Sequence, residues 1–192
     1  MKDRIIAALG NEKLEHVENI TLSQFYVIDL TRRTNSAQSM KIYDKKPHGI
    51  DTLLVENPNL DITATFFKPQ CFREERGGVE PNNCEGVFYL TDSTNATWVL
   101  FLEMKDCDAT NISDYFRKSK KQITETVKIF RNKRIISYGK RVYANISFPR
   151  KHKMDFFNQL IKPGEMKSFI DNHNIFIRGT NKLRIKNNTT IF

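Results

Sequence analysis

Three ionisable residues, Glu85, Glu103 and Lys105, stand at the ends of two strongly apolar runs. Glu85 precedes the run GVFYL, while Glu103 and Lys105 end the run WVLFLEMK, and the stretch TDSTNA lies between the two. Two apolar runs separated by a short turn-forming stretch predict a β-hairpin. A hairpin centred on Thr94 places Glu85 directly opposite Glu103.

This register would give the three residues a common chemistry. Directly opposed residues on one face of a hairpin have Cβ atoms about 4.5 to 5.5 Å apart. Two carboxylates at that distance repel each other unless a cation lies between them, and Mg²⁺ or Mn²⁺ suits carboxylate oxygens. Because side chains alternate along a strand, Lys105 emerges on the same face as Glu103, roughly 7 Å further on. A cation held by two carboxylates beside an amine can activate water for phosphodiester hydrolysis. A slip of one residue would move Glu85 to the opposite face.

The same residues also have a simpler interpretation. The strand could leave the core at Glu103, so that Glu103 and Lys105 form exposed ion pairs of little energetic value at a sheet edge. Three features favour the functional interpretation: the facing Glu85, the helix predicted next along the chain, and a basic segment that follows. Both apolar runs also lack alternation until these ends, which is typical of strands covered on both faces.

The rest of the chain alternates helix-like and strand-like segments. The spacing of apolar residues predicts one or two short helices in 2–20 and an amphipathic helix over 109–131, with Asp108 or Thr110 as its cap. Shorter helices are expected at 156–161 and 166–171, separated by a break at PGE, and residues 68–83 are expected to form a long loop. Strands are predicted at 25–30, 51–57, 60–67, 85–90, 97–104, 134–138, 142–148, 174–178 and 182–186. This order predicts an α/β or α+β fold in one domain of 1–192.

The positive charge of the chain is concentrated in one segment. Residues 117–153 contain 13 Lys or Arg and the single acid Glu125, whereas residues 1–116 carry a net charge of −6. So unequal a charge on a folded segment indicates a surface that binds a polyanion, and nucleic acid is the expected partner. The residues expected to contact it are Arg117, Lys118, Lys120, Lys121, Lys128 and Arg131.

Five other residues are weaker candidates for the same function. Glu15 and Glu18, expected on the first helix, could add a metal ligand. Phe66, Phe67 and Phe72 could stack on bases, although packing in the core explains them more simply.

Other classes of protein are disfavoured by composition. No apolar run approaches the roughly 20 residues of a membrane-spanning helix, and IIAALG is too short for a signal-peptide core. We therefore expect a cytoplasmic protein without a membrane partner. The three cysteines, Cys71, Cys84 and Cys107, are odd in number and lack CxxC spacing, so neither a disulfide framework nor a zinc site is predicted.

An acid at a strand start, a hairpin, Glu-x-Lys at the end of the next strand and a following helix together resemble the PD-(D/E)xK superfamily of restriction-endonuclease-like nucleases. The resemblance implies that Glu85 and Glu103 bind Mg²⁺, that the Met104 carbonyl adds a ligand, and that Lys105 activates or orients the attacking water. Gln122, in FRKSKKQI, matches the glutamine that some branches place in the following helix. The resemblance covers about 79–148. It departs from the pattern because the first acid is Glu and NNCE stands where a Pro-Asp pair is expected.

The resemblance implies a mixed central β-sheet flanked by helices, and a nuclease that hydrolyses DNA with Mg²⁺ or Mn²⁺. RNA is the alternative substrate, and an effector of bacterial defence against phage is the expected context. With no separate specificity domain, a homodimer or a protein partner is expected to supply specificity or activation. The competing interpretation is a non-catalytic nucleic-acid-binding protein that uses the basic segment, or a subunit that retains the fold without the activity.

Overall fold

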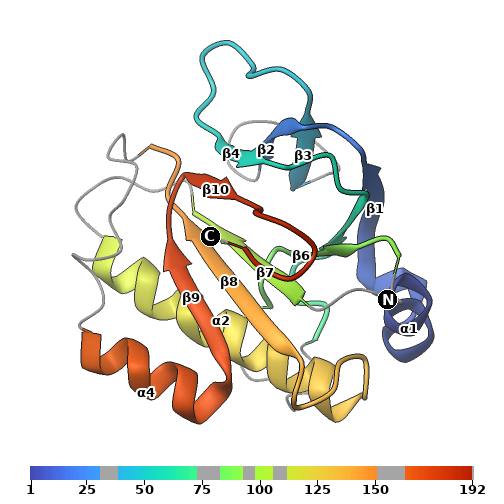
Figure 1. Cartoon of the computed structure of the whole chain (residues 1–192), viewed down its shortest axis with the longest axis vertical. Helices are drawn as coiled ribbons and strands as arrows, with labels where there is room; N and C mark the ends of the chain where they lie inside the picture. The colour runs from blue at the N-terminus through green and yellow to red at the C-terminus, as the bar shows by residue number, and fades with distance from the viewer. Residues whose placement is uncertain (31–38, 73–82, 93–97, 106–111, 151–162, 192) are drawn as a thin grey trace.

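The computed structural model describes residues 1–30, 39–72, 83–92, 98–105, 112–150 and 163–191 (Figure 1). These residues form an α+β fold with two β-sheets. The large sheet has the order β1-β5-β6-β7-β8-β9, and the small sheet has the order β10-β4-β2-β3. The large-sheet strands are β1 (Leu14–Ile20), β5 (Ile62–Phe67), β6 (Gly86–Leu90), β7 (Trp98–Met104), β8 (Arg141–Ser147) and β9 (Ile175–Gly179). The small-sheet strands are β2 (Gln24–Asp29), β3 (Met40–Tyr43), β4 (Leu53–Glu56) and β10 (Lys182–Arg184).

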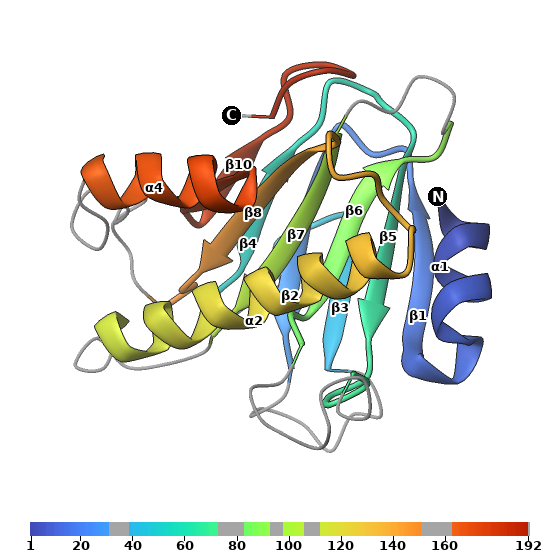
Figure 2. The ribbon, with the colours of Figure 1, turned by 90° about the horizontal axis from the view of Figure 1, so that it is seen from below.

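Within the described residues, three α-helices lie on one face of the large sheet (Figure 2). They are α1 (Lys2–Leu9), α2 (Ile112–Asn132) and α4 (Pro163–His173), and a short 3₁₀ helix, η1 (Asn11–Lys13), follows α1. The opposite face packs against the small sheet through a second apolar cluster. The expected sheet flanked by helices is therefore correct for one face only, because a second sheet covers the other. No described helix has the length and apolar character needed to cross a membrane.

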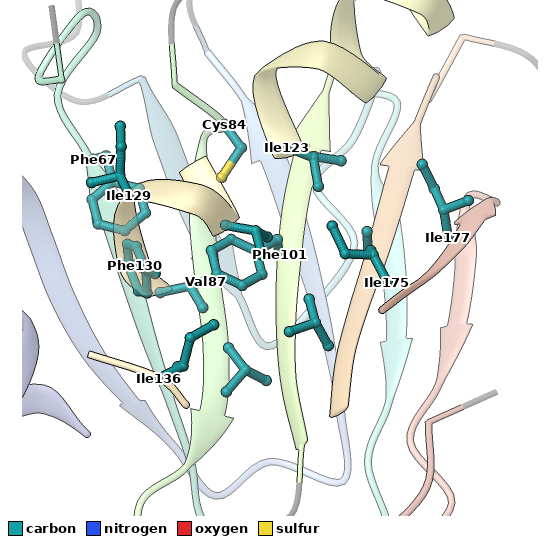
Figure 3. Packing of buried hydrophobic residues seen from close by; sticks show 14 of the residues in the cluster. Phe67, Cys84, Val87, Phe101, Ile123, Ile129, Phe130, Ile136, Ile175 and Ile177 are labelled. Carbon is teal, nitrogen blue, oxygen red and sulfur yellow. The ribbon is translucent and has the colours of Figure 1, made fainter. Parts of the chain in front are cut away.

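The predicted hairpin register is confirmed. β6 and β7 are antiparallel, with Val87 opposite Phe101 and Tyr89 opposite Val99. β7 then pairs in parallel with β8, and α2 lies between them in the chain, so the sheet is mixed. Val87 and Phe101 face the helices, where Phe101 contacts Phe130 of α2 with ring centroids 5.1 Å apart (Figure 3). Every residue of β7 is buried, because each of its faces meets a packed layer.

The N-terminal segment differs from the prediction. Residues 14–20 form strand β1, paired along its length with β5, instead of a second helix. Gly10 ends α1 with φ = 86°, a conformation that side chains disfavour, and its N–H donates to the carbonyl of Ile6. The three-residue spacing of Leu14 and Val17 suggested a helix, but pairing with the buried strand β5 determines their conformation.

The predicted strand at 134–138 is also wrong, because this segment ends α2 instead. Arg134 adopts φ = 57°, its N–H donates to Arg131 O at 2.9 Å, and Ile135 N–H donates to Phe130 O at 2.8 Å. These two bonds form a Schellman motif. Ile135 and Ile136 looked strand-like because they are apolar and β-branched, but they are buried in the helix-side core.

Two further differences concern the small sheet and the C-terminal helix. β3 was not predicted, and the association of 25–30 with 51–57 in a separate sheet left no signal in the sequence. Pro163 starts α4 instead of marking a break, since its missing N–H has no helical acceptor at the first position. The helix predicted at 156–161 and the caps Asp108 and Thr110 lie outside the described residues.

Candidate functional site

The side chains of Glu85, Glu103 and Lys105 meet beside the C-terminal end of β7, a central strand of the large sheet. The Lys105 Nζ lies 2.6 Å from Glu103 Oε1 and 3.4 Å from Glu85 Oε1. The side chain of Glu103 is fully buried, whereas those of Lys105 and Glu85 are 24% and 17% exposed. The three groups therefore form a largely buried cluster instead of the exposed ion pairs of the simpler interpretation. We call Glu85, Glu103 and Lys105 the carboxylate cluster.

Backbone pairing fixes the cluster. The N–H of Glu85 donates to the carbonyl of Leu102 and to Glu103 Oε2, both at 3.1 Å, so the segment before β6 is bonded to the end of β7. On the other side of β7, Lys105 N–H donates to the Ser147 carbonyl at 2.9 Å. The backbone around the cluster is therefore bonded to β7 and both neighbouring strands. Such a rigid support is required for catalytic or ligating side chains.

Burial and like charge change the ionisation of the two acids. Desolvation, together with the charge of Glu85, raises the pKa of Glu103 to about 8 despite the nearby Lys105 ammonium. Burial likewise raises the pKa of Glu85. For Lys105, desolvation alone would lower the pKa, but the charges of Glu103 and Glu85 outweigh it and the pKa rises. At neutral pH the lysine is therefore charged. An additional positive charge nearby would stabilise the ionised forms of the two carboxyl groups.

Gln122 acts on this cluster through the backbone. Its side chain is buried on α2, and Nε2 donates to the carbonyl of Asn83 at 3.1 Å. The Asn83 side chain in turn accepts from Cys71 N–H at 3.0 Å and donates to the carbonyl of Cys84 at 2.9 Å. Gln122 thus holds the segment that leads into Glu85, and the catalytic role that the resemblance implies for it stays a prediction.

Asp29, at the end of β2, was missed from the sequence. It is 9% exposed and lies near enough to Glu85 and Lys105 for its charge to raise the pKa of both. Its signal was available, because Asp29 ends the apolar run FYVID much as Glu103 ends WVLFLE. The partnership between the two sheets, which brings Asp29 close, was not available.

Glu15 and Glu18 lie on strand β1 and not on a helix. Glu15 accepts hydrogen bonds from Ser39 N–H at 2.9 Å and Met40 N–H at 3.1 Å, so it ties β1 to the start of β3. Its charge also contributes to the raised pKa of Glu85. Glu18 lies beside His16.

The donor set of the cluster fits a hard divalent cation in chemistry. Glu85 and Glu103 offer carboxylate oxygens, and Glu103 Oε1 has no aligned hydrogen-bond donor within the described chain although the Lys105 ammonium is close. The carbonyl of Met104, which lies between Glu103 and Lys105 in the sequence, is the predicted third oxygen ligand. No group of three or more His, Cys, Asp or Glu among the described residues is arranged as a metal site. The two carboxylates and the Met104 carbonyl remain the predicted ligands.

The basic side chains of α2 divide into two groups. Lys120 pairs with Glu165 of α4. Arg131 is 8% exposed, and its Nη1 donates to the carbonyl of His173 at 2.7 Å, so it does not belong to the solvent-facing surface. The predicted contacts that are exposed on α2 are Arg117, Lys118, Lys121 and Lys128.

The remaining candidates are structural. Phe66, Phe67 and Phe72 are each at most 2% exposed, so they pack in the core and are not available to bases. Cys71 is partly buried. Cys84 is buried, and burial raises the pKa of its thiol well above the usual value, which disfavours a reactive thiolate. Cys107 lies outside the described residues.

Comparisons of the chain with protein-family models, curated proteins and solved structures find no match. A functional assignment therefore depends on the geometry of the site.

Proposed function

We propose that this chain is a metal-dependent nuclease that hydrolyses DNA, with Mg²⁺ or Mn²⁺ bound between Glu85 and Glu103. The observation that carries the proposal is the carboxylate cluster itself. Two acids and one lysine are buried together at the end of a rigid central strand, and the acids outnumber the cation that balances them. Because the pKa of Glu103 is raised to about 8, ionising both acids at this buried position requires more positive charge than Lys105 supplies, and perturbed ionisable groups of this kind are typical of functional sites.

Each residue would have a distinct task. The metal would neutralise charge that develops on the phosphate and lower the pKa of bound water. Glu85 and Glu103 would hold it, with the carbonyl of Met104 as a further ligand. Because Lys105 holds its proton tightly, its task is to orient the attacking water or a phosphate oxygen by hydrogen bonding, and not to accept a proton. Gln122 would keep the backbone before Glu85 in place.

The order of elements supports a restriction-endonuclease-like core. An acid at the start of β6, the β6–β7 hairpin, Glu-x-Lys at the end of β7, then α2 and the parallel strand β8 follow the pattern that suggested the PD-(D/E)xK superfamily. The small sheet on the second face is an addition to that pattern. Action in bacterial defence, and a homodimer or protein partner that supplies specificity or activation, are parts of the same proposal.

The test is cleavage of supercoiled and linear DNA, and of RNA of the same sequence, with Mg²⁺, with Mn²⁺ and with EDTA. The native chain is compared with Glu103→Gln, Lys105→Met and the control Lys182→Met, which removes a lysine that pairs with Glu56 in the small sheet at 2.5 Å. Metal-dependent cutting by the native and control chains, lost in the two cluster variants, is the expected result. Cutting that survives Glu103→Gln would overturn the proposal.

The competing function is nucleic-acid binding without catalysis. It is favoured by the position of Lys105, which already supplies a cation between the two carboxylates. Titration with Mn²⁺, followed by electron paramagnetic resonance, separates the two functions. A nuclease requires one bound Mn²⁺ that Glu103→Gln abolishes, whereas a binding protein shows no such site and keeps its affinity for DNA.

A further inference from the structure

Tyr138 is an unusually exposed aromatic residue. Among the large hydrophobic side chains of the described residues, only Tyr138 and Leu22 are exposed, at 69% and 39%. Tyr138 follows the Schellman motif that ends α2, in the turn that leads to β8. An exposed aromatic ring is common as an isolated feature, so its surroundings decide whether it has a use.

The ring of Tyr138 is held in place although it faces solvent. Its hydroxyl donates to Asn132 Oδ1 at 3.2 Å, and Asn174 Nδ2 donates to its backbone carbonyl at 3.3 Å. The Arg131 guanidinium carbon lies 5.8 Å from the ring centroid, and Arg131 Nε and Nη2 have no hydrogen-bond partner in the described chain. The ring is therefore preorganised and supported by a buried positive charge.

Positive charge surrounds this ring. Residues 133–141, KRIISYGKR, contain four Lys or Arg and no acid. Lys133, Arg134 and Arg141 are exposed, and Lys140 is partly exposed. Helix α1 lies beside this turn in both views (Figures 1 and 2). Burial and the charge of Arg4, on α1, lower the pKa of Lys140, so a bound anion would relieve the crowding of like charges.

We propose that Tyr138 and the cations of 133–141 form a binding site for single-stranded nucleic acid, in which one base stacks on the ring and flanking phosphates contact the lysines and arginines. Aromatic rings interleaved with basic residues are the usual elements of such sites. A duplex keeps its bases stacked inside, so it can use the charges but not the ring. A membrane fits less well, because a single tyrosine is no apolar face.

The position of the site gives it a role distinct from that of the carboxylate cluster. Arg141 pairs with Trp98 at the start of β7, whereas Glu103 lies five residues further along that strand, about 17 Å away. This inference rests on the proposed function for its partner class, nucleic acid. A strand bound at Tyr138 would be held at a distance from the point of cleavage.

The experiment is fluorescence anisotropy in EDTA, with a labelled oligothymidylate and with a duplex of the same length. The chains are the native protein, Tyr138→Ala, Tyr138→Phe and the control Leu22→Ala. Tyr138→Ala should weaken single-strand binding by roughly 5- to 150-fold, the loss typical of a base-stacking ring, and leave duplex binding unchanged. Leu22→Ala should bind both as the native chain does. Tyr138→Phe keeps the ring but loses the hydroxyl bond to Asn132, so it should lose less single-strand affinity than Tyr138→Ala and bind the duplex as the native chain does.

Charge is tested separately with Arg134→Asn, since asparagine tolerates the positive φ of this position. The slope of the logarithm of affinity against that of salt concentration should decrease by about 0.7, one phosphate contact on a single strand. Native-like single-strand binding by Tyr138→Ala, or an equal loss for the duplex, would overturn the proposal. So would Tyr138-dependent binding to phosphatidylserine vesicles without Tyr138-dependent binding to the oligonucleotide. EDTA prevents metal-dependent cleavage, so this binding assay does not depend on nuclease activity. If the chain binds the oligonucleotide through Tyr138 but cuts neither DNA nor RNA with Mg²⁺ or Mn²⁺, the nuclease proposal is refuted and this site stands.

Discussion

Replacing Lys105 by methionine removes the cation that lies between Glu85 and Glu103. This substitution tests whether the ion pairs of the cluster are shielded from solvent and contribute to the free energy of unfolding. At an effective dielectric constant of about 20, Coulomb attraction is ~6 kcal/mol over the 2.6 Å to Glu103 and ~5 kcal/mol over the 3.4 Å to Glu85. Desolvation offsets much of this gross attraction. Breaking a buried pair by removing one partner typically costs about 3 to 5 kcal/mol, because the remaining charge is left uncompensated. Because the pKa of Glu103 is about 8, this carboxyl is only partly ionised at pH 8, so we expect Lys105→Met to lower the free energy of unfolding by about 3 kcal/mol there, the lower end of that range.

The assay is urea unfolding at pH 5 and pH 8, in EDTA and in Mg²⁺ or Mn²⁺. The loss should be smaller at pH 5, since the two carboxyl groups can take up protons, and divalent cations should restore part of the stability at pH 8. The control is Lys182→Met, whose more exposed pair with Glu56 should contribute no more than about 1 kcal/mol. A loss at pH 8 no larger than that of the control would show that the cluster behaves as a solvated surface pair, against this prediction.

Three further perturbations probe the same edge of the sheet. The pKa of Glu103 is about 8 in the folded chain against 4.5 for the free group, so its folded form retains a proton that the unfolded chain releases. Stability from this group is therefore present below pH 4.5 and declines as pH rises to about 8, by up to ~1.4 kcal/mol per pH unit; urea unfolding across pH should show this decline, and Glu103→Gln should flatten it. Gln122→Ala leaves the buried carbonyl of Asn83 without its donor and should cost about 1 to 3 kcal/mol, measured by chemical denaturation, whereas a cost near zero would show that the bond does not hold this segment. Gly86→Ala would place a Cβ 2.8 Å from the ring of Phe66, so thermal unfolding should show a loss of about 1 to 3 kcal/mol, and an unchanged midpoint would contradict the close packing.

The strands that carry the site were predictable because their signals are local. GVFYL and WVLFLEM are apolar on both faces, and the stretch between them leaves a tight turn as the simplest connection. Because side chains alternate with a period of two, placing the turn also predicted the register of β6 and β7, and Glu85 lies within hydrogen-bonding distance of Glu103. The amphipathic helix of α2 followed from the spacing of residues such as Phe116, Ile123 and Val127.

Local signals failed where distant partners decide the conformation. Leu14 and Val17 suit a helix or a strand, and pairing with β5 makes them a strand. Ile135 and Ile136 have strand propensity, yet the end of α2 and the pocket beneath it determine their position. Arg131 looked like a solvent-facing cation, but the approach of α4 buries it. In each case burial against another element outweighs a propensity worth less than about 1 kcal/mol per residue.

The hairpin, its register, the following helix and the grouping of Glu85, Glu103 and Lys105 could be predicted from the sequence alone. These features depend on alternation and spacing within the 48 residues from Glu85 to the end of α2, where neighbours along the sequence are also neighbours in space. Three other features follow from the packing of distant elements: a second sheet covers the far face, Asp29 lies close enough for its charge to act on Glu85 and Lys105, and Tyr138 remains exposed among cations. Those outcomes depend on how separate elements share a hydrophobic core, and packing of that kind is set by shape and volume across the whole chain.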